Sequence, residues 1–384
     1  MTKRYKIYTL GCKLNYAESS TIARRLEGDG LVMAKAGQSA DMVVINSCAV
    51  TLESEHKTRE TIRRVVRENP DAEVIVTGCY AKLREAEIMA IAGVSRVVTQ
   101  KELTAYSTAG RTRSFLKVQD GCDFHCTYCT VWRARGASRN APIVELVAAA
   151  REIAASGARE IVLTGVNIGD FGRTTGESFL DLLMALEKVD GVERYRISSI
   201  EPNLLTDEVI AFCAHSPKFM PHYHIPLQSG SNEVLRRMGR RYTAEFFAAK
   251  IESIRHSTPD VFIGVDVIVG FPGETQAQFM ETYNVLKTVR PAFLHVFPYS
   301  ARPDTLAATL ADQLDAKIKK ERAAQLGALC VELLDEFTAA SSGKTHSILI
   351  EGRAKNGKLF GHTENYIRQE IDGGDELINT IVRR

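Results

Sequence analysis

Residues 115–129 read FLKVQDGCDFHCTYC, a short apolar strand followed closely by Cys122, Cys126 and Cys129. Three thiols within eight residues of one loop match three corners of a four-iron, four-sulfur cube, which cysteine thiolates hold. The fourth iron of such a cube stays open to a small molecule. A structural zinc site usually takes a second pair of ligands elsewhere in the chain, and no convincing pair follows this loop. The spacing therefore indicates an iron–sulfur site.

The sequence after this loop alternates between strand and helix patterns. Further strands are expected at 160–164, 194–198, 222–225, 261–269 and 293–297, with helical patterns between them. Such alternation is typical of a parallel α/β fold, and six strand–helix units indicate a partial (β/α)6 TIM-like barrel. Active-site groups of such barrels lie at the carboxyl ends of the strands. Polar, glycine-rich stretches occur there, at 163–169, 198–202, 224–231 and 269–275.

The first hundred residues repeat a unit of strand, cysteine and helix. The expected strands are 5–10, 42–46 and 73–77, and they are followed by Cys12, Cys48 and Cys79. The carboxyl ends of parallel strands share one edge of a sheet, so we expect these three thiols, the N-terminal triad, to converge. Small apolar fillers in three turns are the simpler explanation, but three coincident placements favour a metal site. An iron–sulfur cluster is favoured over zinc.

Composition limits the class of protein. The chain has 384 residues, of which 45% are hydrophobic and 25% are charged, as in globular proteins of two or three domains. No apolar run could span a membrane, and the N-terminus lacks the apolar core of a signal peptide. We therefore expect no membrane partner and a cytoplasmic, reducing location, where disulfides are rare. Cys213 and Cys330 lie on apolar helical stretches and are expected to be buried, inert thiols.

Longer motifs resemble one family over residues 3–382, the methylthiotransferases, which are radical S-adenosylmethionine (SAM) enzymes. The N-terminal triad stands in GCKLN, NSCAV and TGCYA, and the loop cysteines stand in QDGCDFHCTYC, followed by ARG at 134–136. Within the family, LTGVNIGDFG, RISSIEPNLL, FMPHYHIPLQSGS, RRYTAE, IGVDVIVGFPGET, LHVFPYSARP and GHTENYIR look most like the bacterial enzymes that modify threonylcarbamoyladenosine in tRNA.

The resemblance implies two [4Fe-4S] clusters and SAM as cofactors. Cys122, Cys126 and Cys129 correspond to the catalytic cysteines, whose cluster binds SAM and cleaves it to a 5′-deoxyadenosyl radical. The N-terminal triad corresponds to the ligands of an auxiliary cluster. By the same resemblance, the residues that contact SAM are Thr164, Glu201, Gln228 and Arg241.

The resemblance also implies three domains. Residues 1–105 would form the methylthiotransferase domain and residues 108–340 the radical SAM domain. Residues 343–384 would form a small, shortened β-barrel of the TRAM type that binds RNA. The expected partners are the anticodon loop of tRNA and an electron donor such as flavodoxin or ferredoxin.

The predicted reaction is methylthiolation of carbon 2 of N6-threonylcarbamoyladenosine at position 37 of tRNA, with SAM as both radical source and methyl donor. Carbon 2 carries an unactivated C–H bond, which protein acids, bases and nucleophiles cannot functionalise, so a radical cofactor is needed. Two alternatives within the family act on isopentenyl-adenosine in tRNA or on an aspartate of a ribosomal protein. An alternative of another class is a non-catalytic iron–sulfur or zinc protein that binds RNA.

RNA binding requires local basic surface, because the net charge is only +2. Candidate residues fall into four groups: Lys57, Arg59, Arg63, Arg64 and Arg67; Trp132, Arg133, Arg135 and Arg139; Arg236, Arg237, Arg240 and Arg241; and Lys355, Lys358, Tyr366 and Arg368. His222 and His224 alternate on one expected strand, so they share a face. We interpret them as polar residues that line the barrel rather than as metal ligands.

Overall fold

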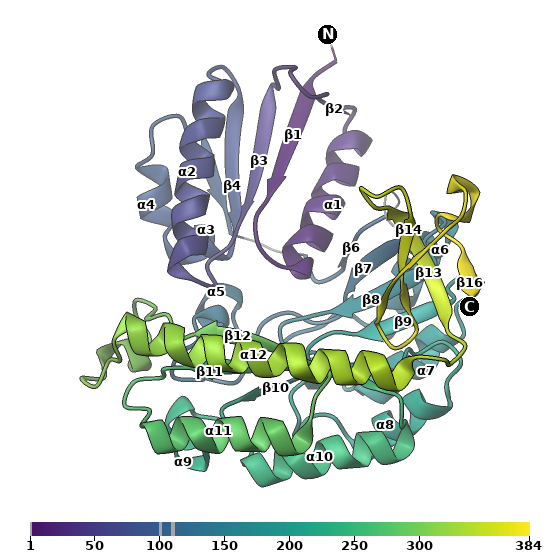
Figure 1. Ribbon diagram of the computed structural model, residues 1–384. Helices are drawn as coiled ribbons and strands as arrows, with labels where there is room; N and C mark the ends of the chain where they lie inside the picture. The colour runs from purple at the N-terminus through teal and green to yellow at the C-terminus, as the bar shows by residue number, and fades with distance from the viewer. Residues whose placement is uncertain (1, 100–101, 109–111) are drawn as a thin grey trace.

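The computed structural model describes residues 2–99, 102–108 and 112–384 (Figure 1). An N-terminal sheet with helices is followed by a larger assembly of parallel strands and helices, and a small sheet at the C-terminus lies against that assembly (Figure 1). No helix in the described part of the chain is long and apolar enough to cross a membrane.

The N-terminal sheet is parallel and has the strand order β2-β1-β3-β4-β5. Its core consists of β-branched side chains from β3 and β4 packed against one face of α2, such as Val43, Ile62 and Val76. Its elements are β1 (Arg4–Thr9), α1 (Lys13–Gly28), β2 (Val32–Met33), β3 (Met42–Ser47), α2 (Leu52–Glu68), β4 (Glu73–Gly78), α3 (Cys79–Leu83), α4 (Glu85–Met89) and β5 (Arg96–Val98).

The central part carries six parallel strands, β7 to β12, in two hydrogen-bonded groups. Parallel bridges between Tyr195 and Phe219, and between Ser199 and His224, join β9 to β10. The strands are β7 (Arg113–Lys117), β8 (Glu160–Thr164), β9 (Arg194–Ile197), β10 (His222–Gln228), β11 (Phe262–Val269) and β12 (Phe293–Pro298), and the short β6 (Ala105–Tyr106) pairs antiparallel with β7.

Helices lie between and around these strands (Figure 1). Their apolar faces and the strands form one continuous core, to which Leu163, Phe247 and Val265 belong. The helical elements are α5 (Val131–Arg135), α6 (Ile143–Ala155), η1 (Ile168–Asp170), α7 (Phe179–Glu187), α8 (Asp207–His215), α9 (Asn232–Met238), α10 (Ala244–Ser257), α11 (Gln276–Val289), η2 (Leu306–Thr309) and α12 (Ala316–Ser341).

The last part is an antiparallel sheet of four strands in the order β15-β14-β13-β16. It docks on β9 through two buried arginines: Arg194 donates to the carbonyl of Ser347 (2.7 Å), and Arg196 donates to the carbonyl of Thr363 (2.9 Å). Its elements are β13 (Ser347–Arg353), β14 (Leu359–Thr363), β15 (Arg368–Ile371), η3 (Asp375–Leu377) and β16 (Ile381–Arg383).

The predicted α/β fold class is confirmed. Among the described residues, β7 and β12 do not pair with each other, so the six strands form an open barrel. The helical segment that follows β4 divides into α3 and α4 at Arg84, whose backbone leaves the helical region (φ −136°, ψ 42°). The Arg84 guanidinium pairs with Asp304 at 2.9 Å, a contact with the barrel that the local pattern does not contain. The three domain boundaries stay a prediction.

Candidate active site

The N-terminal triad lies at the carboxyl edge of the first sheet. Cys12 is the N-cap of α1 after β1, Cys48 directly follows β3, and Cys79 begins α3 after β4. These three strands are neighbours in the sheet. Burial raises the pKa of the Cys48 thiol, and the nearby Cys79 and Cys12 sulfurs raise it further. The three cysteines therefore gather at one edge of the sheet.

Glycine precedes Cys12 and Cys79 for a steric reason. Gly11 has φ +108°, and a Cβ there would lie 2.9 Å from the Cys48 sulfur. Gly78 has φ +98°, and a Cβ there would lie 2.3 Å from the backbone oxygen of Ser47. Both turns pass so close to the neighbouring strand end, in the left-handed region, that only glycine fits without strain.

Cys122, Cys126 and Cys129 form a second group, the loop triad, between β7 and α5. Each sulfur accepts one hydrogen bond: the N–H of Phe124 donates to Cys122 (3.3 Å), the N–H of Val131 donates to Cys129 (3.4 Å), and Arg240 donates to Cys126 (3.2 Å).

Burial raises the pKa of Cys122 to about 11 and that of Cys129 to about 12, and the charge of Cys126 raises both. Without a cation the Cys122 and Cys129 thiols keep their protons at neutral pH. Because a metal takes up thiolates and releases those protons, three converging sulfurs that already accept hydrogen bonds fit an iron–sulfur cluster. The cysteines of the N-terminal triad, which end neighbouring strands, also suit an iron–sulfur cluster.

A cavity of about 360 Å³ opens beside the loop triad. All three loop cysteines line it, and so do Val50 and Thr51, which follow Cys48 of the N-terminal triad. Helix α2 begins at this point because Thr51 is its N-cap: the Thr51 side chain accepts a hydrogen bond from the N–H of Ser54 (3.1 Å). The cavity therefore lies between the barrel and the N-terminal sheet and reaches toward both triads.

The four SAM contacts implied by resemblance divide into two pairs. Glu201 and Gln228 line the cavity, and Gln228 has φ +65°, a strained conformation that is frequent at functional sites. The Thr164 hydroxyl is buried and donates to the carbonyl of Leu116 (3.2 Å). Arg241 donates to the carbonyl of Asp123 (3.1 Å) with its guanidinium over the ring of Phe124. Neither Thr164 nor Arg241 is among the residues that line this cavity.

Arg240, and not Arg241, is among the residues that line the cavity. Its guanidinium pairs with Glu201 and also donates to the Cys126 sulfur and to the Tyr128 hydroxyl. Burial lowers the pKa of Arg240, but the charges of Tyr128, Tyr242 and Glu201 raise it well above its usual value. Sequence reasoning had assigned Arg240 to a basic surface run; the side chain is a permanent buried cation beside the loop triad.

Arg135 also lies inside rather than on the surface. Its guanidinium donates to Glu18 (2.9 Å), Asp120 (2.9 Å) and Asn15 (2.8 Å), and Lys117 pairs with the same two carboxylates. Burial raises the pKa of Asp120, but Arg135 and Lys117 together hold it well below its usual range. This network joins α1 of the N-terminal sheet to the two ends of the loop triad.

A second ion pair crosses the same boundary. Arg302, which is 3% exposed and lines the cavity, pairs with Glu55 of α2. Its Nε and Nη1 atoms have no hydrogen-bond partner within the described ranges. Arg302 is thus a second buried cation at the cavity wall, and no spacing in the sequence indicated it.

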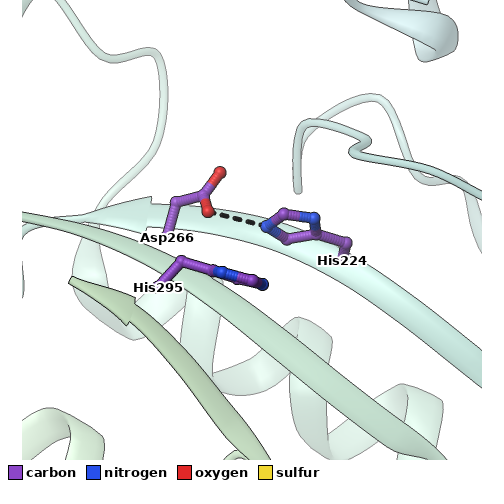
Figure 2. Close-up of side chains that lie close together, drawn as sticks. All are labelled: His224, Asp266 and His295. Atoms are coloured by element: carbon purple, nitrogen blue, oxygen red, sulfur yellow. Dashed lines mark hydrogen bonds and ion pairs between the residues drawn. The ribbon is translucent and has the colours of Figure 1, made fainter. Parts of the chain in front are cut away.

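His222 and His224 are brought to the interior of the open barrel. His222 is half-buried and lines a separate cavity with Lys13 and Tyr366. His224 hydrogen-bonds to Asp266, with 2.7 Å between Nε2 and Oδ1, and His295 lies beside them (Figure 2). Asp266 and His295 were not expected from the sequence, because the three residues come from three separate strands.

Two family models match this chain, one over the N-terminal sheet and one over most of the central strands and helices. Residues 4–99 match the family described as uncharacterized protein family UPF0004, and residues 116–286 match the radical SAM superfamily. Among solved structures, the radical S-adenosylmethionine methyltransferase TsrM from Kitasatospora setae superposes with a TM-score of 0.57 at 14% identity, over 80% of this chain and 77% of that one. At this identity the likeness concerns the fold alone.

Curated relatives match nearly the whole chain. The threonylcarbamoyladenosine tRNA methylthiotransferases MtaB of Bacillus subtilis and Thermotoga maritima are 40% and 36% identical, over 98% and 97% of this chain and 92% of each relative. The tRNA-2-methylthio-N(6)-dimethylallyladenosine synthase of Sphingopyxis alaskensis is 35% identical over 94% of this chain and 89% of its own length. With these matches, the chain belongs to the tRNA methylthiotransferase family of radical SAM enzymes.

Proposed function

We propose that this protein adds a methylthio group to carbon 2 of N6-threonylcarbamoyladenosine at position 37 of tRNA. The observation that carries the proposal is one cavity, lined by the loop triad and reaching toward the N-terminal triad. The names of the Bacillus subtilis and Thermotoga maritima relatives supply the substrate.

Each triad would hold its own iron–sulfur cluster. Cys122, Cys126 and Cys129 would hold one [4Fe-4S] cluster, and Cys12, Cys48 and Cys79 would hold another. With SAM bound, these groups supply the one-electron chemistry, the sulfur and the methyl group that an unactivated C–H bond needs. Both sulfur-ligand sets would then act on a single substrate position, which would remove the entropy of bringing the reactants together.

Side chains around the loop triad would orient SAM. Glu201 and Gln228 present a carboxylate and an amide to the cavity, which suits the ammonium group and the hydroxyls of SAM. Arg240 holds Glu201 and the Cys126 sulfur in place. Thr164 and Arg241 would support SAM binding from behind this layer, through the carbonyls of Leu116 and Asp123 that they hold.

The proposed partners follow from the reaction. tRNA would present its anticodon loop to the cavity, and a flavodoxin or ferredoxin would supply electrons. Arg133, which is exposed near the loop triad, is available for phosphates. Arg139 is partly buried and pairs with Asp120, and Arg135 and Arg240 are buried. Because thiol ligands need a reducing compartment, we place the protein in the cytoplasm.

Nucleoside mass spectrometry of tRNA from cells that lack the gene tests the proposal. Loss of the methylthio form of threonylcarbamoyladenosine, restored by the intact gene but not by a Cys126→Ala copy, is expected. Loss of the methylthio form of dimethylallyladenosine would instead indicate the activity named for the Sphingopyxis alaskensis relative. An unchanged tRNA profile would contradict the proposal and point to a protein substrate.

Anaerobic iron and sulfide analysis of the reconstituted protein separates an enzyme of this kind from a non-catalytic RNA-binding protein. Two clusters require about eight iron and about eight sulfide ions per chain. Zinc without sulfide would contradict the assignment of both triads.

A further inference from the structure

Three polar side chains from three strands meet inside the open barrel: His224 on β10, Asp266 on β11 and His295 on β12. Asp266 stands opposite His295 in the register of β11 and β12. Their ligand atoms lie within 4.8 Å of one another, and Figure 2 shows the side chains gathered on one face of the sheet. These three residues are called the polar cluster below.

Asp266 connects the polar cluster to the proposed substrate cavity, because it lines that cavity while His224 and His295 lie next to it. Asp266 lines that cavity together with Pro226, which follows His224 at the next alternate position on β10, before the irregularity at Gln228. Side chains at alternate positions of a strand point to the same face. A group that enters the cavity between the two triads therefore reaches the polar cluster by extending toward the amino ends of the strands.

Much of the hydrogen-bonding capacity of the polar cluster is unused. Asp266 receives the His224 hydrogen bond on Oδ1, and its Oδ2 has no recorded partner in the described ranges. Neither ring nitrogen of His295 has a hydrogen bond there, and neither does the ammonium of Lys13, which comes directly after Cys12. Lys13 lines the neighbouring cavity together with His222, which precedes His224 by two residues on β10. Partial desolvation and the charges of His224 and Lys13 lower the pKa of His295, against the charge of Asp266.

We propose that the polar cluster binds the amino-acid substituent of the target adenosine, an inference that rests on the proposed function. A threonylcarbamoyl group ends in a carboxylate and a hydroxyl. The carboxylate would accept hydrogen bonds from His295 and from Lys13, and the hydroxyl would donate to Oδ2 of Asp266. The cluster would then hold the base with carbon 2 between the two triads.

The same chemistry explains a preference between substrates of the family. A dimethylallyl group, named for the Sphingopyxis alaskensis relative, has no polar atom. To bury it against the polar cluster would leave a carboxylate and imidazole nitrogens without water or hydrogen bonds, which is unfavourable. Sites built to hydrogen-bond a substrate reject analogues that lack the polar group by large factors. A divalent cation is the competing occupant, but the ammonium of Lys13 disfavours a cation nearby.

Binding of two synthetic anticodon stem-loops to the holoenzyme tests the inference. The RNAs differ only in the threonylcarbamoyl group on adenosine 37, and anaerobic calorimetry gives the ratio of their affinities for each protein variant. We expect the modified RNA to bind the parent about tenfold or more tightly. The ratio should fall to about one in His295→Leu and in Asp266→Leu. In Asp266→Asn, which keeps a hydrogen-bond acceptor, the ratio should lie between one and the parent value.

His256→Leu is the matched control, because His256 is exposed on α10; it should keep the parent ratio. A merely structural role of His295 would weaken both RNAs and leave the ratio unchanged, and that outcome would overturn the inference. One equivalent of Zn²⁺ or Mn²⁺ bound by the parent and lost in His295→Leu would also overturn it. Methylthiolation of threonylcarbamoyl tRNA by the parent is measured separately, so failure of the proposed function is distinguishable from failure of this subsite.

Discussion

Arg135 Nη2 donates a 2.8 Å hydrogen bond to Asn15 Oδ1, and this contact connects the two triads. Asn15 lies on α1 three residues after Cys12 and donates to the carbonyls of Leu10 and Ser47, which flank Cys12 and Cys48. Arg135 ends α5, which follows the loop triad. The separation of the two proposed clusters is thus set by buried hydrogen bonds rather than by a flexible linker.

Arg135→Met should destabilise the apoprotein strongly, because it removes a buried cation that pairs with both Glu18 and Asp120. Lys117 still pairs with both carboxylates in the variant, and Arg139 with Asp120. Breaking a buried ion pair by removing one partner costs about 3–5 kcal/mol. The measurement is the free energy of unfolding in urea. Arg133→Met, an exposed residue of the same helix, should change it by less than about 0.5 kcal/mol. Equal effects of the two variants would argue against a structural role of the network.

Gly78→Ala should impair the N-terminal triad specifically. A Cβ at Gly78 would lie 2.3 Å from the backbone oxygen of Ser47, in a backbone with φ +98°, so β4 must shift where Cys79 begins α3. We expect the reconstituted variant to hold about four iron ions rather than about eight. Gly28→Ala is the control, since nothing lies within 4 Å of its Cβ position. Full iron content in Gly78→Ala would show that the triad tolerates this shift.

The attachment of the C-terminal sheet should weaken as the pH rises. His346 Nδ1 lies 2.9 Å from Glu364 Oε1; burial lowers the pKa of His346, but the hydrogen bond to Glu364 and the one to Ser341 raise it above its usual value overall. A raised folded-state pKa contributes stability below the unfolded value of about 6.5, and that stability is lost as the pH rises through the raised pKa.

Hydrogen exchange of the β13 amides, corrected for intrinsic rates, should therefore report more frequent opening at pH 8.5 than at pH 6. In His346→Gln the difference should shrink, because no titrating imidazole remains. An identical pH dependence in both proteins would assign the effect to another group.

The two triads should separate functionally. Cys126→Ala removes a ligand of the loop triad and should abolish formation of 5′-deoxyadenosine from SAM. Cys48→Ala removes a ligand of the N-terminal triad and should leave SAM cleavage but stop methylthiolation of tRNA. Cys213→Ala, a buried thiol of α8 far from either motif in the sequence, is the control. Parent-level methylthiolation by Cys48→Ala would refute the auxiliary site.

The positions of the cysteines could be predicted because they depend on one rule: the ends of parallel strands meet at one edge. Cys12, Cys48 and Cys79 follow neighbouring strands, so their convergence needed only a correct assignment of strands. The contacts of Arg135 could not be predicted, because Glu18 is 117 residues away in the sequence, on α1 beside the N-terminal sheet. For the polar cluster, β-strand periodicity gave the face of His224 but not the strands that would bring Asp266 and His295 to it.

Arg240 and Arg241 show where periodicity fails. They follow Gly239, which ends α9 in the left-handed conformation with φ +74°. Beyond such a turn neither helical nor strand periodicity fixes the direction of a side chain. The pattern of residues therefore could not distinguish the two arginines, and family resemblance assigned the SAM contact to Arg241. The structure points Arg240 toward Glu201 and Cys126, and it points Arg241 toward the carbonyl of Asp123.

Because the two arginines make different contacts, we expect their alanine variants to differ in the KM for SAM. Arg240→Ala leaves Glu201 without its buried cation and removes the hydrogen bond to the Cys126 sulfur, so we expect the KM for SAM to rise at least about tenfold, which corresponds to about 1.4 kcal/mol. Arg241→Ala removes a hydrogen bond and a contact with Phe124 at the edge of the loop and should raise the KM by less than about threefold. Initial rates of 5′-deoxyadenosine formation at varied SAM concentration give both values. A larger effect of Arg241→Ala would mean that the arginine implied by family resemblance contacts SAM directly, and that Arg240 serves only to neutralise Glu201.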